Sequence, residues 1–372
     1  MIENNDKISR HQLCTLLIIN LFGTTSLTLP RYGAEAAGTD GWIAILGAVA
    51  LACLFVFVIT RLTKRFPDST FVEFTEKIVT KPVAIAISLV LCGLLIVFSA
   101  LELRMFGEIV KQTLLNRTPL GVITATMLLT VVYSARKGYE CRARMAEIFI
   151  FLIFIPIIIL ILFAIPQVDL HNLGPIFTTS PKEVVTGSVQ ISMKFSVLIL
   201  LLVGGSFLAK DQRKHVGRSV ILAVILVGIV DILLFFLTMG SFGETGTVES
   251  LWPVMNLMQI IDIPILEIER QDALMMVFWI LTEFTLINEY VFFAGIILQK
   301  IFRKRSHRKF LLPLVPVIFI LSFIPPGVME TFAWMDAVYF WTGILFLLPI
   351  PLLLLLISKG RGLKEDGYDQ SY

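Results

Sequence analysis

Several ionisable side chains lie inside long apolar stretches of this sequence, where a charge is costly. Lys194 is the clearest case, because an ammonium in the middle of a membrane-spanning helix costs at least about 2.5 to 3.5 kcal/mol. Opposite charges at similar depth in a membrane are typical of paired groups in the protein interior. We therefore predict an intramembrane charge network containing Glu102, Arg104, Asp231 and Glu289. For Lys194, snorkelling of the ammonium to the outer surface is the alternative.

A run of glycine and hydroxyl residues interrupts the first apolar stretch. The segment from Gly23 to Pro30 reads Gly-Thr-Thr-Ser-Leu-Thr-Leu-Pro, which makes a poor helix and a good unwound segment. In hydrocarbon such a break survives only where it lines a cavity or is buried in protein. An open break would direct backbone N–H groups and the positive end of the next half-helix towards a carboxylate. A simple proline kink, with the hydroxyls bonded back onto the helix, is the alternative interpretation.

Another apolar stretch contains two glutamates that point in different directions. Thr282, Thr285 and Glu289 recur at spacings of three and four residues and so share one face of a helix, whereas Glu283 lies on another face. One site is therefore not expected to use both carboxylates. Glu283 is the candidate for a pocket, and a protonated structural carboxyl is the alternative for Glu289.

The composition indicates a membrane protein. Of the 372 residues, 56% are hydrophobic and 16% are charged, and the mean hydropathy is +0.86, whereas soluble domains contain about 25% charged residues. The net charge of +3 gives no argument for binding nucleic acid. The four cysteines are scattered and predict neither a zinc site nor a disulfide framework. Since the sequence has no Walker A, H-E-x-x-H or G-x-S-x-G motif, we expect no enzyme, no cofactor and no metal site.

The apolar stretches predict a single transmembrane domain of ten helices. A spanning helix needs roughly 20 mostly apolar residues, so ten spans leave only short loops and tails at 1–10 and 358–372. The predicted spans are 11–32, 42–60, 83–110, 120–133, 145–165, 185–208, 216–238, 271–298, 311–324 and 335–357. On this assignment 24 of the 31 lysine and arginine residues lie on the side of both termini and five lie on the other side. Positive charge favours the cytoplasm, so both termini are predicted to be cytoplasmic.

The N-terminal stretch also has features of a cleavable signal peptide. Its apolar residues from Leu13 to Leu29 precede the small residues Ala34-Glu35-Ala36. However, the apolar stretch exceeds the usual length of about 7 to 15 residues and has Gly23 in its middle. We therefore expect a retained membrane span.

Short motifs along the first 210 residues carry a family resemblance. The first span contains Gly-x-x-x-x-x-Leu-Pro-Arg from Gly23 to Arg31. The further landmarks are Asp40-Gly41-Trp42, Arg65-Phe66-Pro67, Arg104, Thr118-Pro119, Tyr133, Arg136-Lys137-Gly138, Glu140, Ala143-Arg144, Ala146-Glu147 and Asn172-Leu173-Gly174-Pro175. In this order they resemble the B subunits of GerA-type spore germinant receptors, a branch of the amino acid, polyamine and organocation transporter superfamily.

The resemblance implies a LeuT-like, all-α fold. It would consist of two inverted repeats of five helices, here 11–165 and 185–357, with the first and sixth spans discontinuous around a ligand site. Carried onto this sequence, the ligand contacts are Gly23, Thr24, Thr25 and Ser26 from the first span, Lys194, Phe195 and Ser196 from the sixth, and a wall that includes Glu283. The resemblance also implies an A subunit and a lipoprotein C subunit as partners in the inner membrane of a bacterial spore.

Two functions are compatible with such a site. A receptor subunit would bind a small amino-acid-like nutrient better in one conformation than in another and pass the change to its partners, which starts spore germination. A secondary transporter would alternate access to the same site and couple it to a proton on Glu283, Glu289 or Lys194. A membrane scaffold with a vestigial pocket is a third interpretation. Only the resemblance favours the receptor.

Overall fold

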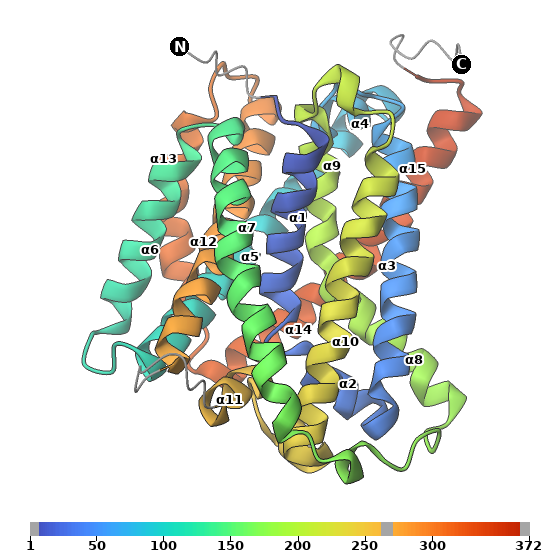
Figure 1. The fold of residues 1–372 in the computed structure, drawn as a ribbon. Coiled ribbons are helices and arrows are strands. Elements are labelled where there is room, and N and C mark those ends of the chain that lie inside the picture. Colours follow the sequence, from blue (N-terminus) through green and yellow to red (C-terminus); the bar gives the residue numbers. More distant parts are fainter. Residues whose placement is uncertain (1–6, 262–270, 365–372) are drawn as a thin grey trace.

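Helices form the regular secondary structure of the computed structural model, which describes residues 7–261 and 271–364 (Figure 1). The predicted tails lie partly outside the described residues. In chain order the α-helices are α1 (Arg10–Thr25), α2 (Leu29–Ala37), α3 (Gly41–Thr63), α4 (Phe71–Ile78), α5 (Lys81–Thr113), α6 (Leu120–Ala135), α7 (Tyr139–Ala164), α8 (Pro181–Ser192), α9 (Leu200–Gly204), α10 (Val216–Glu249), α11 (Pro253–Ile260), α12 (Gln271–Ile301), α13 (Arg308–Ser322), α14 (Val328–Thr342) and α15 (Pro349–Gly360).

Each of the ten predicted spans overlaps helix in the structure. By length and composition alone, seven helical segments of the described chain qualify as membrane spans: Leu29–Thr63, Lys81–Thr113, Tyr139–Gln167, Pro181–Phe207, Val216–Glu249, Trp279–Ile301 and Val328–Gly360. The helix α6 is apolar but shorter. The described chain is therefore an all-helical membrane protein with at least seven candidate spans.

The first predicted span is two helices separated by a turn. Helix α1 begins at a capping box in which the Ser9 hydroxyl accepts a hydrogen bond from the Gln12 N–H. It ends at Thr25, and the hydroxyls of Thr24 and Thr25 donate back to the Leu21 carbonyl at 2.8 and 3.0 Å. Helix α2 then starts with proline in its first turn, where the missing N–H is harmless. Both sequence interpretations hold in part, because the chain leaves the helix and the hydroxyls also bond back onto it.

Helix α1 lies in the middle of the bundle (Figure 1). It packs against α7, α10, α12 and the 3₁₀ segment η4 (Met193–Ile199). A Cβ added at Gly23 would lie 3.1 Å from Cβ of Thr282, so glycine allows α1 and α12 to approach closely. The end of α1 and the middle of α12 are thereby brought together.

The sixth predicted span is also irregular. Between α8 and α9 the backbone tightens into η4, and Phe195 leaves helical geometry with φ −78° and ψ 18°. Facing η4 is the π-helical segment η7 (Gly343–Leu347), which follows α14. A Cβ at Gly343 would lie 1.9 Å from Sδ of Met193, so only glycine leaves room for that side chain. Irregular helical segments of this kind are frequent at functional sites.

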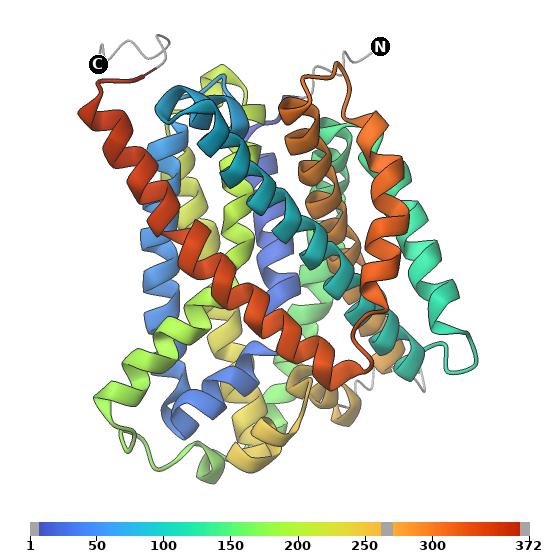
Figure 2. The same cartoon turned by 180° about the vertical axis from the view of Figure 1, so that it is seen from behind.

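The start of α1 and the end of α15 lie at the same end of the bundle, while α5 and the α14–α15 segment cross its back obliquely (Figure 2). At that end, the Ile8 N–H donates to the Phe207 carbonyl at 2.9 Å and ties the chain start to the end of the sixth predicted span. Arg213 donates to Oδ1 of Asp68 at 3.0 Å. This hydrogen bond holds the pKa of the Asp68 carboxyl below its ordinary value.

Candidate functional site

An inner pocket begins at the break between α1 and α2. Its volume is about 40 Å³. The lining includes Gly23, Thr24 and Thr28 at the break, Glu102 on α5, Lys194 on η4 and Glu283 on α12. Further polar lining residues are Tyr32 on α2 and Asp336 and Tyr339 on α14. Apolar walls are added by Met105, Ile109, Trp252, Trp279, Phe332 and Met335. The pocket therefore unites residues from Gly23 to Tyr339, which lie near opposite ends of the sequence.

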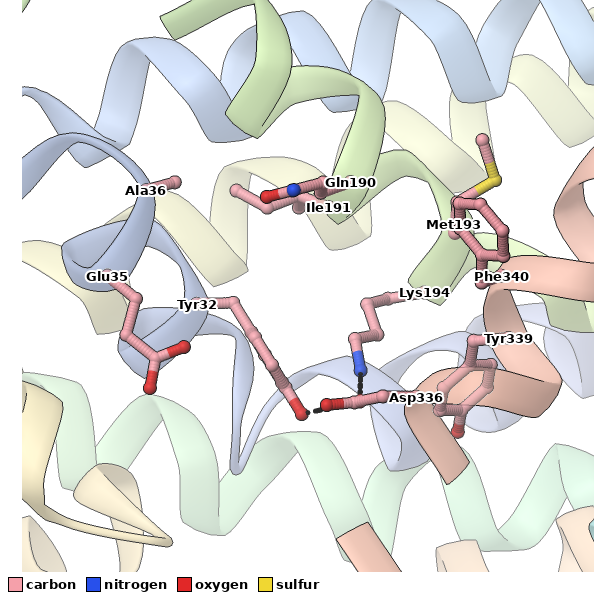
Figure 3. A pocket seen from close by; sticks show the side chains of 10 residues that line it. All are labelled: Tyr32, Glu35, Ala36, Gln190, Ile191, Met193, Lys194, Asp336, Tyr339 and Phe340. Carbon is pink, nitrogen blue, oxygen red and sulfur yellow. Dashed lines mark hydrogen bonds and ion pairs between the residues drawn. The ribbon is translucent and has the colours of Figure 1, made fainter. Parts of the chain in front are cut away.

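A larger outer cavity of about 330 Å³ lies next to the inner pocket. It is bounded by α2, α8, η4 and α14 (Figure 3). Four residues line both spaces: Tyr32, Lys194, Asp336 and Tyr339. These four side chains therefore stand between the two spaces.

Lys194 is held by one carboxylate and two aromatic rings. It is 8% exposed, and its ammonium forms an ion pair with Asp336 (Figure 3). Its Nζ lies 3.8 Å from the ring centroid of Tyr32 and 4.7 Å from that of Tyr339. The Tyr32 hydroxyl donates to the same Asp336 oxygen at 2.9 Å. The ammonium thus has partners inside the protein, which argues against snorkelling to the surface.

The two glutamates of the inner pocket differ in their partners. Glu102 is 4% exposed and accepts a hydrogen bond from the Tyr339 hydroxyl at 3.0 Å. Glu283 is 2% exposed, and no group of residues 7–261 or 271–364 bonds to its buried Oε2. An unpaired buried carboxylate oxygen is costly, so Glu283 is the lining residue most in need of a partner.

Other predicted ligand contacts lie around the pocket rather than in its wall. The Thr25 hydroxyl donates to Oδ1 of Asp231 at 3.1 Å, and Ser26 lines a separate apolar pocket. Phe195 and Ser196 are fully buried but line neither the inner pocket nor the outer cavity. Of the eight predicted contacts, Gly23, Thr24, Lys194 and Glu283 line the inner pocket.

The structure does not bring the predicted charge network together. Arg104 pairs with Glu108 at 2.9 Å. Asp231 accepts from Thr25, as described above, and Glu289 accepts from the Asn20 amide at 2.9 Å. Each group has a partner outside the predicted network, because helix packing places each one against a different neighbour.

The two glutamates of α12 do lie in different places, as their spacing predicts. Glu283 lines the inner pocket, whereas Glu289 and Thr285 line a small pocket that also includes Arg142 and Asn288. The Arg142 guanidinium donates to the carbonyl and side-chain oxygens of Asn288 at 3.0 and 3.2 Å.

Sequence reasoning missed Asp336, Tyr32 and Tyr339. Asp336 was detectable, because it is an ionisable residue inside the predicted span 335–357. The two tyrosines had no comparable signal, since aromatic residues in a membrane protein are mostly core or lipid-facing. Their role beside Lys194 depends on how α2 and α14 meet η4.

The chain is similar to known proteins over nearly its whole length. A family model described as Spore germination protein matches residues 7–329. Spore germination protein YndE of Bacillus subtilis (strain 168) is 28% identical over 97% of this chain and 99% of its own length. Spore germination protein GerLB of Bacillus cereus is 26% identical over 95% of both chains. Spore germination protein A2 of Bacillus subtilis (strain 168) is 24% identical, covering 95% of this chain and 97% of its own.

The fold is similar to that of a solved protein. The crystal structure of MhsT in complex with L-phenylalanine matches with a TM-score of 0.74 over 96% of this chain and 90% of the MhsT chain. Sequence identity is 14%, so this likeness concerns the fold, which is LeuT-like. The family model covers most of the chain, and the helices are apolar enough to cross a membrane. The chain therefore belongs to the spore germination protein family.

Proposed function

We propose that this chain is the ligand-binding subunit of a nutrient germinant receptor. It binds a small amino-acid-like nutrient in the inner pocket and passes the resulting change of conformation to an A subunit and a lipoprotein C subunit. The observation that carries the proposal is the inner pocket itself, which joins the α1–α2 break to Lys194 and Glu283. Family membership supports the role in germination.

The proposal includes a specific architecture in the spore inner membrane. The chain crosses the membrane ten times as two inverted five-helix repeats, 11–165 and 185–357, with both termini in the cytoplasm. The likeness to MhsT supports the arrangement of the helices. The common location of the α1 start and the α15 end supports an even number of crossings (Figure 1). The asymmetry of lysine and arginine supports the orientation.

Conformational signalling requires that the nutrient bind one state better than the other. The four side chains between the two spaces offer such a difference, because a ligand that reaches the inner pocket from the outer cavity must displace them. Opening would separate η4 from α14, which the Lys194–Asp336 pair joins.

The test uses the full-length chain in liposomes and in spores. Purified chain should bind a small amino acid and show no uptake when a pH gradient is imposed. In spores, Lys194→Met should change the dose or selectivity of the nutrient response. An unchanged response would show that the site does not need this lysine, and absence of all amino acid binding would favour the scaffold.

A proton-coupled amino acid transporter is the second candidate. The observation in its favour is Glu283, a buried carboxylate that lines the pocket and could exchange a proton with a ligand. Robust uptake driven by the pH gradient, abolished by Glu283→Gln, would establish this function instead of the receptor.

A further inference from the structure

The inner pocket admits only a small chemical group. A cavity needs at least about 10 to 15 Å³ to hold one water molecule. The inner pocket of about 40 Å³ therefore accommodates only a few non-hydrogen atoms. The inner pocket would therefore hold only part of an amino acid, and the remainder would extend towards the outer cavity of about 330 Å³. The inner pocket thus binds one small polar group of the ligand rather than the whole molecule.

The charges that line this pocket are unbalanced. Glu102 and Glu283 are both more than nine-tenths buried. Lys194 is the one lysine or arginine among the described lining residues, and its ammonium is already paired with Asp336. Asp336 also lines the pocket, so three carboxylates face one ammonium, and the lining lacks positive charge.

The missing positive charge has a defined place. Glu102 accepts a hydrogen bond from the Tyr339 hydroxyl, whereas Oε2 of Glu283 has no hydrogen-bond donor among residues 7–261 and 271–364. A ligand ammonium supplies three N–H donors and a positive charge, and both are what an unpaired buried carboxylate lacks. Because Lys194 is held by Asp336, it is not available to bind a ligand carboxylate in this conformation.

We propose that the inner pocket recognises the ammonium of a primary amine through Glu283, with Glu102 as the second carboxylate of the site, and that a ligand carboxylate is not required. The ligand class is therefore small primary amines, of which amino acids are one kind. This inference rests on the proposed function, since it names the chemical group of the nutrient that the proposed site recognises. Thr24 and Thr28 also line the pocket and add hydroxyl groups to it.

The experiment measures binding to the full-length chain in lipid nanodiscs by calorimetry. The probes are glycine, L-alanine, L-valine and L-phenylalanine, each as the free amino acid, as the carboxamide and in N-acetylated form. For any member that binds, we expect the carboxamide to bind within about threefold of the free amino acid. The N-acetylated form should lose about ten- to hundredfold in affinity, as expected for a charged hydrogen bond. This series uses the unchanged chain and does not depend on the folding of a variant.

The matched variants are Glu283→Gln and Glu108→Gln. Each replaces a mostly buried carboxylate by an amide of similar shape, but Glu108 pairs with Arg104 and lines neither space. Glu283→Gln should lose about ten- to hundredfold in affinity for the carboxamide. Glu108→Gln should retain it.

The outcomes separate the inference from the proposed function. Equal binding of the N-acetylated and free forms would overturn the inference, and so would loss of the carboxamide, which would make the carboxylate the recognised group. Either result leaves an amino acid site in place. Failure of every probe to bind the unchanged chain would overturn the proposed function and the inference with it.

Discussion

The ion pair between Lys194 and Asp336 joins two unequally buried groups. The Lys194 side chain is 10% exposed, whereas that of Asp336 is 47% exposed. The two ends of the pair should therefore respond differently to removal of the partner. A buried charge that loses its partner has no replacement from solvent, but a half-exposed charge can be hydrated.

The magnitudes follow from this asymmetry. Breaking a buried pair costs about 3 to 5 kcal/mol, and an exposed pair is worth at most about 1 kcal/mol. Asp336→Asn leaves the buried ammonium without its carboxylate partner. Because the ammonium retains its cation–π contacts with Tyr32 and Tyr339, we expect a smaller loss, about 2 to 3 kcal/mol in unfolding free energy. Lys194→Met leaves a carboxylate that water can reach and fills the space of the lysine stem, so we expect a loss of less than about 1 kcal/mol.

The double variant tests whether the two single substitutions act through the same ion pair. Once methionine replaces the lysine, Asp336→Asn strands no charge, so the double variant should be as stable as Lys194→Met within about 0.5 kcal/mol. Unfolding free energies can be measured by tryptophan fluorescence in mixed micelles with increasing SDS. The reasoning is refuted if Lys194→Met is the more destabilising single change, or if the two single losses simply add.

The remaining predictions concern the end of the bundle and its packing. Asp68→Asn removes the negative charge that pairs with Arg213. Because the folded pKa of Asp68 lies below its ordinary 3.8, the carboxylate stabilises the fold above that value and ceases to do so as the pH falls through the folded pKa. The melting-temperature difference from wild type should hold from about pH 7 to about pH 5 and shrink below about pH 4, and a difference that grows in acid would contradict this. Gly228→Ala places a Cβ 2.4 Å from Cγ2 of Val49 and should cost about 1 to 3 kcal/mol, which Val49→Ala should partly restore in the double variant. Gly93→Ala, with open space around its Cβ, should be neutral or stabilising by up to about 1 kcal/mol, and a larger loss there than at Gly228 would count against the packing described.

Much of the site could be located before the fold was known. Gly23 and Thr24 were detectable because glycine and hydroxyl residues before a proline disfavour helix in any context. Lys194 and Glu283 were detectable because charges in apolar stretches are rare unless they serve a purpose. The separation of Glu283 from Glu289 followed from helical periodicity alone.

The pairing of these residues was beyond the reach of the sequence. The sequence predicted one charge network of Glu102, Arg104, Asp231 and Glu289. Instead, Arg104 pairs with Glu108 on its own helix, and Asp231 and Glu289 accept hydrogen bonds from α1. Depth in the membrane is one coordinate, whereas a hydrogen bond also requires the correct rotation of two helices. Rotation is set by close contacts such as Gly23 against Thr282, which no local pattern reveals.

The sequence alone determined that this chain is helical and apolar, where its first span breaks, and which buried charges need partners, because these properties depend on composition and on spacing of a few residues. Only the tertiary structure decided that Asp336 neutralises Lys194 and that Oε2 of Glu283, at the inner pocket, has no hydrogen-bond partner within the described part of the chain. The physical reason is that pairing acts over a few ångströms, between atoms on helices that are far apart in the chain and meet only when the bundle is packed.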